Sequence, residues 1–366
     1  MKFKHLLFFF TVLSLAILAS ACTGGGAVAS SWPGLTINGD YAYVASGTQI
    51  YTVALSNGIE KTRYPEKPDS KISYYASPAF TPDGQIIIGG YDHVLYSLNP
   101  TNNQQNWLFK DAKNRYIAAA LVTDKAIFAP NSDGTLYALN LNGVKKWSFK
   151  TKGALWATPV FDSQCNCLYL SSMDHHIYAL NPDTGVELWN SVDLGGAVVG
   201  SPALNSDGTL YIGSFGDNLQ AISAKDGSFV WAKPIITGGW VWSGPALADG
   251  KLYFGDLGGN FYAVDASNGT ILWQLKPNQL DGPISGTPVV KDNLVYFTTE
   301  LGFLFSVDTT GNIESLKKYT VEGKLYAGPV VSGELILVTP SGKGNQLVAF
   351  TKDGAIQWQF NPNPAK

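Results

Sequence analysis

The side chains that could carry out acid–base, nucleophilic or metal chemistry are few in this sequence and lie far apart. Beyond the N-terminal segment the only histidines are His93, His175 and His176, and no cluster of metal ligands accompanies them. His93 and His175 stand at a recurring turn position, where histidine tolerates a left-handed backbone. The sequence also lacks a G-x-S-x-G nucleophile elbow and a phosphate-binding P-loop. It therefore predicts neither catalytic residues nor a metal site.

Cysteine offers two further kinds of chemistry, disulfide formation and covalent modification. Cys165 and Cys167 flank Asn166 in an expected hairpin, where a disulfide would close a very small ring. An oxidising compartment would favour that bond, and two free thiols are the alternative. The third cysteine is Cys22, which ends the segment LASAC.

The N-terminal segment has the features of a targeting signal. Two lysines precede an apolar run over residues 6–18, which is too short to cross a bilayer as a stable helix. The segment LASAC resembles a bacterial lipobox, which implies a signal peptide over 1–21 and lipid attachment at Cys22. A Gly-rich tether over 22–31 would then join the anchor to the fold. An ordinary secretory signal peptide with a chance cysteine is the alternative.

Composition excludes one class of partner. Charged residues make up 14% of the chain, the formal net charge is −3, and only Arg63 and Arg115 are arginines. Nucleic-acid binding usually requires a basic surface, so none is expected. Hydrophobic residues make up 45%, which is ample for a core.

The charges are unevenly distributed along the chain. Basic residues outnumber acidic ones over 60–152, and the reverse holds over 153–366. This asymmetry would orient a charged partner, and the alternative is an uneven solvated surface without a function.

Internal repeats determine the expected architecture. A closing tryptophan recurs, with the first five copies 40 to 42 residues apart, at Trp107, Trp147, Trp189, Trp231, Trp273 and Trp358. A proline before a short apolar pair gives a second series, in which Ala119 takes the place of the missing proline of the third repeat. When the positions near Thr62 and Ser315, which lack a tryptophan, are included, both series count eight repeats over 32–361. A β-sandwich would not keep so regular a period, and solenoid repeats are usually shorter or helical.

Each repeat is expected to form four short strands. In the fifth repeat they are 201–204, 209–214, 218–223 and 228–232, separated by turn residues such as Asp-Gly and Gly-Asp. The two middle strands are apolar on both faces, which is typical of a sheet packed between two others. The sequence therefore predicts an all-β fold, an eight-bladed β-propeller of four-stranded antiparallel blades. Because the first and last repeats each supply four strands, we expect no strand to be shared at ring closure.

The repeated phrase A-x-(D/N)-x-x-x-G-x-x-x-W resembles the tryptophan-docking repeat of the PQQ-like, quinoprotein-type propellers. The resemblance implies that each tryptophan lies on the outermost strand and packs on the neighbouring blade. Thr62 and Ser315 stand near two expected tryptophan positions, so weaker contacts are expected there. The adjacent cysteine pair and the calcium ligands of the quinone enzymes cannot be matched, so no cofactor is expected, with pyrroloquinoline quinone as the alternative. The lipobox, tether and uninterrupted propeller are also similar to lipid-anchored scaffolds of the BamB family.

One further alignment of the repeats selects a candidate binding site. Three residues before the proline marker, five of the eight repeats carry an aromatic ring, namely Tyr75, Tyr116, Trp156, Trp242 and Tyr326. Trp240 lies close to this series in the sequence. We expect these rings at one height around the channel mouth, where they would bind a sugar, a peptide or an extended partner chain. The alternative is that they cap the core between blades.

Together these features predict a non-catalytic scaffold that is exported and lipid-anchored at the bacterial cell membrane or outer membrane. Its expected partners are envelope or membrane proteins, or an extended polymer, at the propeller face, with membrane contact only through the anchor. A quinone-dependent dehydrogenase-like redox protein and a carbohydrate- or ligand-binding sensor are the alternative functions.

Overall fold

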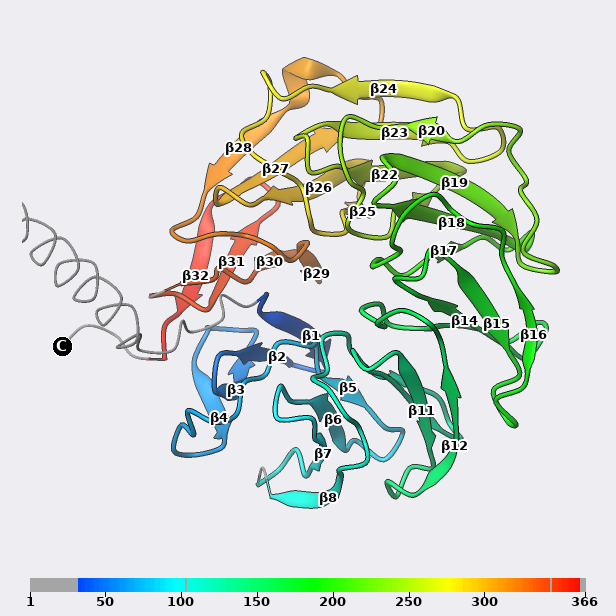
Figure 1. Cartoon of the computed structure of the whole chain (residues 1–366). Helices are drawn as coiled ribbons and strands as arrows, with labels where there is room; N and C mark the ends of the chain where they lie inside the picture. The colour runs from blue at the N-terminus through cyan, green and yellow to red at the C-terminus, as the bar shows by residue number, and fades with distance from the viewer. Residues whose placement is uncertain (1–31, 103, 343, 363–366) are drawn as a thin grey trace, which may run out of the picture. The chain divides into compact units, whose positions relative to one another are not determined.

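The computed structural model describes residues 32–102, 104–342 and 344–362, and the predicted signal peptide, Cys22 and the tether lie outside them. The described chain forms eight four-stranded antiparallel sheets, and each sheet consists of four consecutive strands. The sheets succeed one another around a central axis (Figure 1). This arrangement confirms the predicted all-β, eight-bladed propeller.

The strands follow the chain from the innermost to the outermost position of each blade. Blades 1 and 2 contain β1 (Gly34–Asn38), β2 (Tyr41–Ser46), β3 (Gln49–Ala54), β4 (Glu60–Tyr64), β5 (Ala79–Phe80), β6 (Ile86–Gly89), β7 (Leu95–Leu98) and β8 (Gln105–Phe109). Blades 3 and 4 contain β9 (Leu121–Val122), β10 (Ile127–Pro130), β11 (Thr135–Leu139), β12 (Lys145–Lys150), β13 (Val160–Asp162), β14 (Cys167–Ser171), β15 (Ile177–Leu180) and β16 (Glu187–Asn190).

The second half of the chain repeats the same order. Blades 5 and 6 contain β17 (Ala203–Leu204), β18 (Thr209–Ser214), β19 (Asn218–Ser223), β20 (Ile235–Ile236), β21 (Ala246–Ala248), β22 (Lys251–Gly255), β23 (Phe261–Asp265) and β24 (Ile271–Leu275). Blades 7 and 8 contain β25 (Val289–Lys291), β26 (Leu294–Thr299), β27 (Phe303–Asp308), the 3-10 helix η2 (Ile313–Ser315), β28 (Lys317–Thr320), β29 (Val330–Ser332), β30 (Leu335–Val338), β31 (Leu347–Thr351) and β32 (Ile356–Phe360). Among the described residues, no helix is long and apolar enough to span a membrane.

The hydrophobic core lies between the blades. All residues of the middle strands β14 and β15 are buried, whereas the outer strand β16 is mostly exposed. Eight clusters of buried side chains occupy the eight seams, and each draws on two neighbouring blades. Strands that are apolar on both faces therefore bury each face against a different neighbour.

Six seams share one docking geometry. In each, the indole N–H of the closing tryptophan donates to a backbone carbonyl of the next blade, at 2.8–3.2 Å. The pairs are Trp107 to Leu141, Trp147 to Pro182, Trp189 to Ala224, Trp231 to Ala266, Trp273 to Thr309 and Trp358 to Leu55. The indole lies over a glycine with positive φ, for example Trp147 over Gly185, where a Cβ would overlap the ring. The glycine and the tryptophan of the repeated phrase thus serve two different seams.

The two remaining seams differ from each other. In blade 1, Thr62 pairs with Thr52, just as Trp147 pairs with Ala138, so a threonine occupies the docking position. The rings of Tyr43 and Phe80, 4.7 Å apart, pack across that seam instead.

In blade 7 the prediction that the docking position lies near Ser315 is wrong. Ser315 ends η2, and the following strand brings Tyr319 over Gly354, as the tryptophans lie over their glycines. The 3-10 turn delays the outer strand, so the packing ring comes four residues later than the spacing indicates.

Blade 5 also departs from the prediction. The second and third strands have the expected ranges, and the first is shorter than 201–204, but the fourth strand is not 228–232. Only Phe229 forms an isolated bridge, to Ile222, before β20 resumes the pairing at Ile235. Pro234 has no N–H to donate to a strand ladder, which explains the interruption. Trp231 still docks on blade 6 despite the lost pairing.

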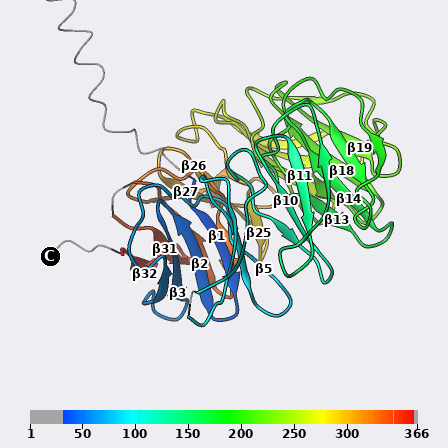
Figure 2. The same ribbon diagram turned by 60° about the horizontal axis from the view of Figure 1, so that its bottom comes forward.

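Ring closure uses side chains instead of a shared strand. β1 pairs with β2, and β29 pairs with β30, so the prediction that no strand is shared is confirmed. Trp358 donates to the carbonyl of Leu55 at 2.8 Å, and Thr339 Oγ1 donates to the carbonyl of Pro33 at 3.2 Å. Figure 2 shows the last blade beside the first, and one hydrophobic cluster joins them.

Candidate functional site

A central channel of about 630 Å³ opens among the innermost strands of the eight blades. In each blade, consecutive residues of the segment that leads into the innermost strand, here called the incoming segment, line this channel. The first lining positions in blades 2 to 8 are held by Tyr75, Ile117, Trp156, Val199, Trp242, Ser285 and Tyr326. Four of the aromatic residues chosen from the sequence therefore lie along this channel.

Tyr116 does not belong to this ring, and the prediction that placed it there is wrong. Its side chain is 1% exposed and packs in the core between blades 2 and 3. It belongs to a buried series one residue earlier, comprising Tyr74, Tyr116, Leu155, Val198, Val241, Ile284 and Leu325. Pro78 is the residue before β5, and the residue before β9 is Ala120, not Ala119. The sequence alignment of the third repeat was therefore wrong by one residue.

Aromatic side chains from several blades form a continuous surface at the mouth of the channel. The ring of Trp242 lies 6.2 Å from Trp156, 5.1 Å from Phe215 and 5.2 Å from Trp32, measured between centroids. Trp32 in turn lies 6.2 Å from Tyr326. These side chains come from four incoming segments and one turn, so propeller closure assembles the surface.

Trp240 stands outside the channel lining at the rim of this surface. It is 48% exposed and stacks on Phe215, with centroids 4.6 Å apart and planes 11° apart. Its backbone carbonyl accepts a hydrogen bond from Leu257 N, in the turn between β22 and β23. The corresponding carbonyl in blade 3 is that of Arg115, so Trp240 and Arg115 occupy equivalent rim positions.

Tyr75 lies in a more enclosed part of the mouth. It is 4% exposed, and its ring meets Tyr91 with centroids 4.3 Å apart. The guanidinium of Arg115 lies 5.3 Å from the centre of the Tyr91 ring. Burial raises the pKa of Tyr91 to about 12, although the charge of Arg115 acts in the opposite direction. This phenol is therefore a neutral hydrogen-bonding group at physiological pH.

One carboxyl group flanks the mouth in blade 7. Burial raises the pKa of Glu300, while the neighbouring Ser285 side chain and the charge of Lys324 act to lower it. The Lys324 ammonium lies 5.8 Å from the centre of the Tyr326 ring. Charges of both signs thus surround the aromatic surface, but none of the described residues that line the channel is charged.

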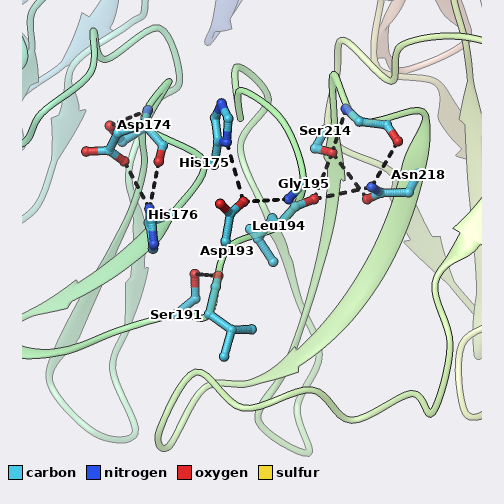
Figure 3. A network of polar contacts seen from close by, with 12 residues as sticks. Asp174, His175, His176, Ser191, Asp193, Leu194, Gly195, Ser214 and Asn218 are labelled. Atoms are coloured by element: carbon cyan, nitrogen blue, oxygen red, sulfur yellow. Dashed lines mark hydrogen bonds and ion pairs between the residues drawn. The ribbon is translucent and has the colours of Figure 1, made fainter.

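His175 and His176 belong to a polar network at the junction of blades 4 and 5 (Figure 3), whereas His93 lies in the turn between β6 and β7. His93 and His175 have φ values of 70° and 76°, which confirms them as left-handed turn residues. His175 Nδ1 lies 3.4 Å from Asp193 Oδ1, and His176 Nδ1 lies 2.7 Å from the carbonyl of Asp174. The Gly195 amide lowers the pKa of Asp193, and His175 acts in the same direction. Within the described ranges, no group of three or more potential ligands could hold a metal ion.

Cys165 and Cys167 are joined by a disulfide, with their Cα atoms 5.2 Å apart. Cys165 is exposed, Cys167 begins β14, and Asn166 between them has a φ of 52°. The bond lies within the turn of the β13–β14 hairpin and joins Cys165 to the first residue of β14. Neither residue is among those that line the channel.

Sequence reasoning missed two members of the aromatic surface. Phe215 lies in the turn between β18 and β19, and the corresponding turn position in blade 2 carries Tyr91. Trp32 immediately precedes Pro33, a position at which the other blades have small residues, namely Ser77, Ala119, Thr158, Ser201, Gly244, Thr287 and Gly328. A search for bulky exceptions within each aligned position would have found Trp32.

Comparison with solved structures finds two whose fold is similar to that of this chain. BamB from Moraxella catarrhalis is 16% identical with a TM-score of 0.70, over 84% of this chain and 92% of that chain. The computationally designed protein Ika8 is 14% identical with a TM-score of 0.70, over 90% and 97% of the two chains. At these identities the likeness shows the fold alone.

The sequence itself matches a protein family over most of its length. No curated protein matches it significantly. The family model described as outer membrane protein assembly factor BamB matches residues 41–163 and 173–314. The matched segments contain the docking tryptophans of blades 2 to 6. The chain therefore belongs to the PQQ-like β-propeller family of the outer membrane protein assembly factor BamB.

Proposed function

We propose that this protein is a non-catalytic, lipid-anchored scaffold of the bacterial envelope that binds envelope proteins at the channel mouth. Its family, described as an outer membrane assembly factor, supports a scaffold role. The observation that carries the proposal is the aromatic surface built from Trp240, Phe215 and Trp242 at the mouth. A fold alone does not specify a function, so the proposal rests on this site.

The aromatic surface has the properties of a protein-binding site. The docking tryptophans Trp231 and Trp358 are 6% and 9% exposed, whereas Trp240 is 48% exposed. Aromatic side chains supply much of the binding energy at interfaces, and they lose little entropy when a rigid scaffold already holds them. The rings at this mouth are held by incoming segments and turns that are tied to one another by backbone hydrogen bonds.

The same proposal includes the absence of a quinone cofactor. Calcium-assisted quinone chemistry requires carboxylate ligands, and the described channel-lining residues include none. Glu300 lies beside the channel and is not among those residues. We therefore expect the purified protein to show no quinone-dependent dye reduction after quinone and calcium are added.

Capture of envelope proteins is expected to depend on Trp156 and Trp242. Replacing both by alanine should abolish capture from solubilised membranes. The reason is that Trp242, which contacts most of the other rings, and its neighbour Trp156 are lost together. The melting temperature should remain close to that of the parent, since both side chains are only half-buried. Affinity pull-down with quantitative mass spectrometry checks the first result, and thermal unfolding checks the second.

A matched variant controls for the loss of an exposed ring. Phe229 is 46% exposed on the outer edge of blade 5, and Phe229→Ala should leave capture unchanged. Capture by the double variant at the parent level would contradict the mouth as the binding site. Dye reduction that requires added quinone would contradict the non-catalytic assignment.

Lipid anchoring gives a separate prediction at Cys22, which lies outside the described residues. Cys22→Ser removes the thiol that would be acylated, so the protein should move from the membrane fraction to the soluble fraction. Detergent-phase partition of the parent and the variant checks this result. Equal partition of the two proteins into the detergent phase would exclude Cys22 as the anchor.

A further inference from the structure

We propose that the channel mouth is also a binding site for a short, neutral oligosaccharide. In this site Trp240 and Trp242 would stack on the sugar rings, and the Ser243 hydroxyl would form a hydrogen bond to the ligand. The inference goes beyond protein capture, because it assigns a small-molecule ligand to the space inside and directly above the channel.

The first argument is the geometry of the rings. Trp240 stacks almost parallel on Phe215, and Phe215 meets Trp242 at an angle of 38°. The mouth therefore contains ring faces in two orientations, which suits a ligand with more than one flat surface. The C–H face of a pyranose ring carries partial positive charge, and it complements the negative face of an indole. A half-exposed tryptophan packed on a second aromatic ring is a platform for such stacking.

The second argument is a buried hydroxyl without a partner. Ser243 lines the channel and is 8% exposed, and its Oγ has no hydrogen-bond partner among the described residues. Other hydroxyls of the lining donate to a carbonyl of a neighbouring blade: Thr158 to Ala119, Ser201 to Thr158 and Ser285 to Tyr326. Buried polar groups are nearly always paired, so a ligand hydroxyl that met Ser243 Oγ after a rotation of the side chain would supply the missing hydrogen bond.

A second unpaired donor belongs to a ring that neighbours Trp242. The indole N–H of Trp156 is buried and also lacks a partner among the described residues. Its ring lies 6.2 Å from that of Trp242, the residue before Ser243. The docking tryptophans, by contrast, all donate to carbonyls. Two unpaired donors beside a stacking surface match a ligand that carries several hydroxyl groups.

The third argument is the size and charge of the space. About 630 Å³ falls within the range of about 300–1,000 Å³ that is typical of small-molecule sites. The described lining residues carry no charge, so a charged ligand inside the channel would lose its hydration without gaining an ion pair from the lining. Trp32, which also lines this space, lies 5.2 Å from Trp242 between ring centroids. These features favour a short, uncharged oligosaccharide.

The test is calorimetric titration of the full-length protein, in a detergent without a sugar headgroup. The probes are chitotetraose, maltotetraose and a neutral peptide of six residues. We expect saturable binding of at least one oligosaccharide. Trp240→Ala should weaken that binding by about tenfold or more, because one stacking face is lost. Ser243→Ala should weaken it by about three- to tenfold, because one hydrogen bond is lost.

Two controls separate binding from folding and from protein capture. Phe229→Ala removes an exposed ring from the same blade as Phe215 and should bind the oligosaccharide as the parent does. Each variant should retain the melting temperature of the parent. Because the titration contains no partner protein, failure to capture envelope proteins would leave its result unaffected.

Three results would overturn the inference. The first is the absence of saturable binding for either oligosaccharide at concentrations up to about 10 mM. The second is oligosaccharide binding that Trp240→Ala leaves unchanged. The third is binding of the peptide with no binding of either oligosaccharide, which would assign the channel to a polypeptide segment.

Discussion

Replacing Trp358 by alanine is expected to lower the free energy of unfolding by about 3–5 kcal/mol. The indole is 9% exposed, it lies over Gly58, and its N–H donates to the carbonyl of Leu55. Because no strand is shared between the first and last blades, this side chain is a principal contact that closes the ring. Its removal leaves a cavity at the closing seam and a carbonyl without its partner.

Urea denaturation followed by circular dichroism would measure this loss. Trp240→Ala is the matched control, since it removes the same side chain from an exposed position and should cost much less. Equal losses for the two variants would mean that Trp358 does not close the ring as described. A closing seam that opens before the others would also make the variant more sensitive to proteolysis near Leu55.

Gly328→Ala is expected to destabilise the protein by about 1–3 kcal/mol or more. Gly328 is the last residue before Pro329 in the segment that leads into β29. A Cβ at this position would overlap the carbonyl oxygen of Thr287, which belongs to the segment leading into blade 7. Because the obstacle is backbone and not a flexible side chain, blades 7 and 8 would have to move apart.

The control for Gly328 is Ser77→Ala at the equivalent position of blade 2. Ser77 already carries a Cβ at this level of the channel, so its replacement should change stability by less than about 0.5 kcal/mol. Thermal unfolding of both variants checks the prediction. A Gly328→Ala protein as stable as Ser77→Ala would show that the blades can separate there without loss of packing.

The tryptophans of this chain have two different roles. Trp189 and the other docking residues hold neighbouring blades together through an indole N–H and a glycine. Trp156 and Trp242 line the channel, and the Trp156 N–H has no partner among the described residues. The same residue type thus serves stability at the outer strands and recognition at the mouth.

The architecture could be predicted from the sequence because its determinants are local. Turn chemistry, the doubly apolar middle strands and a period of about 41 residues recur in each repeat, and together they specify four-stranded blades and their number. The docking phrase could be recognised for the same reason, since its glycine and tryptophan lie on consecutive elements of one blade.

The predicted positions were wrong where one repeat departs from the regular pattern. The third repeat is shifted by one, which moved Tyr116 from the channel into the core. In blade 7 a 3-10 turn precedes the outer strand, so Tyr319 lies over the glycine instead of a residue near Ser315. In blade 5 Pro234 interrupts the outer strand. A one-residue shift reverses which face of the chain a side chain occupies, and spacing alone cannot locate the shift.

The candidate site was decided by tertiary structure. The sequence indicated Trp156, Trp240, Trp242 and Tyr326, but it gave no reason to join them to Phe215 or Trp32. Residues 32, 242 and 326 come into contact only because the ring closes and brings the segments leading into blades 1, 6 and 8 to one channel. Repetition along the chain determines what each blade is, whereas contacts across the channel depend on how all eight blades pack around a common axis.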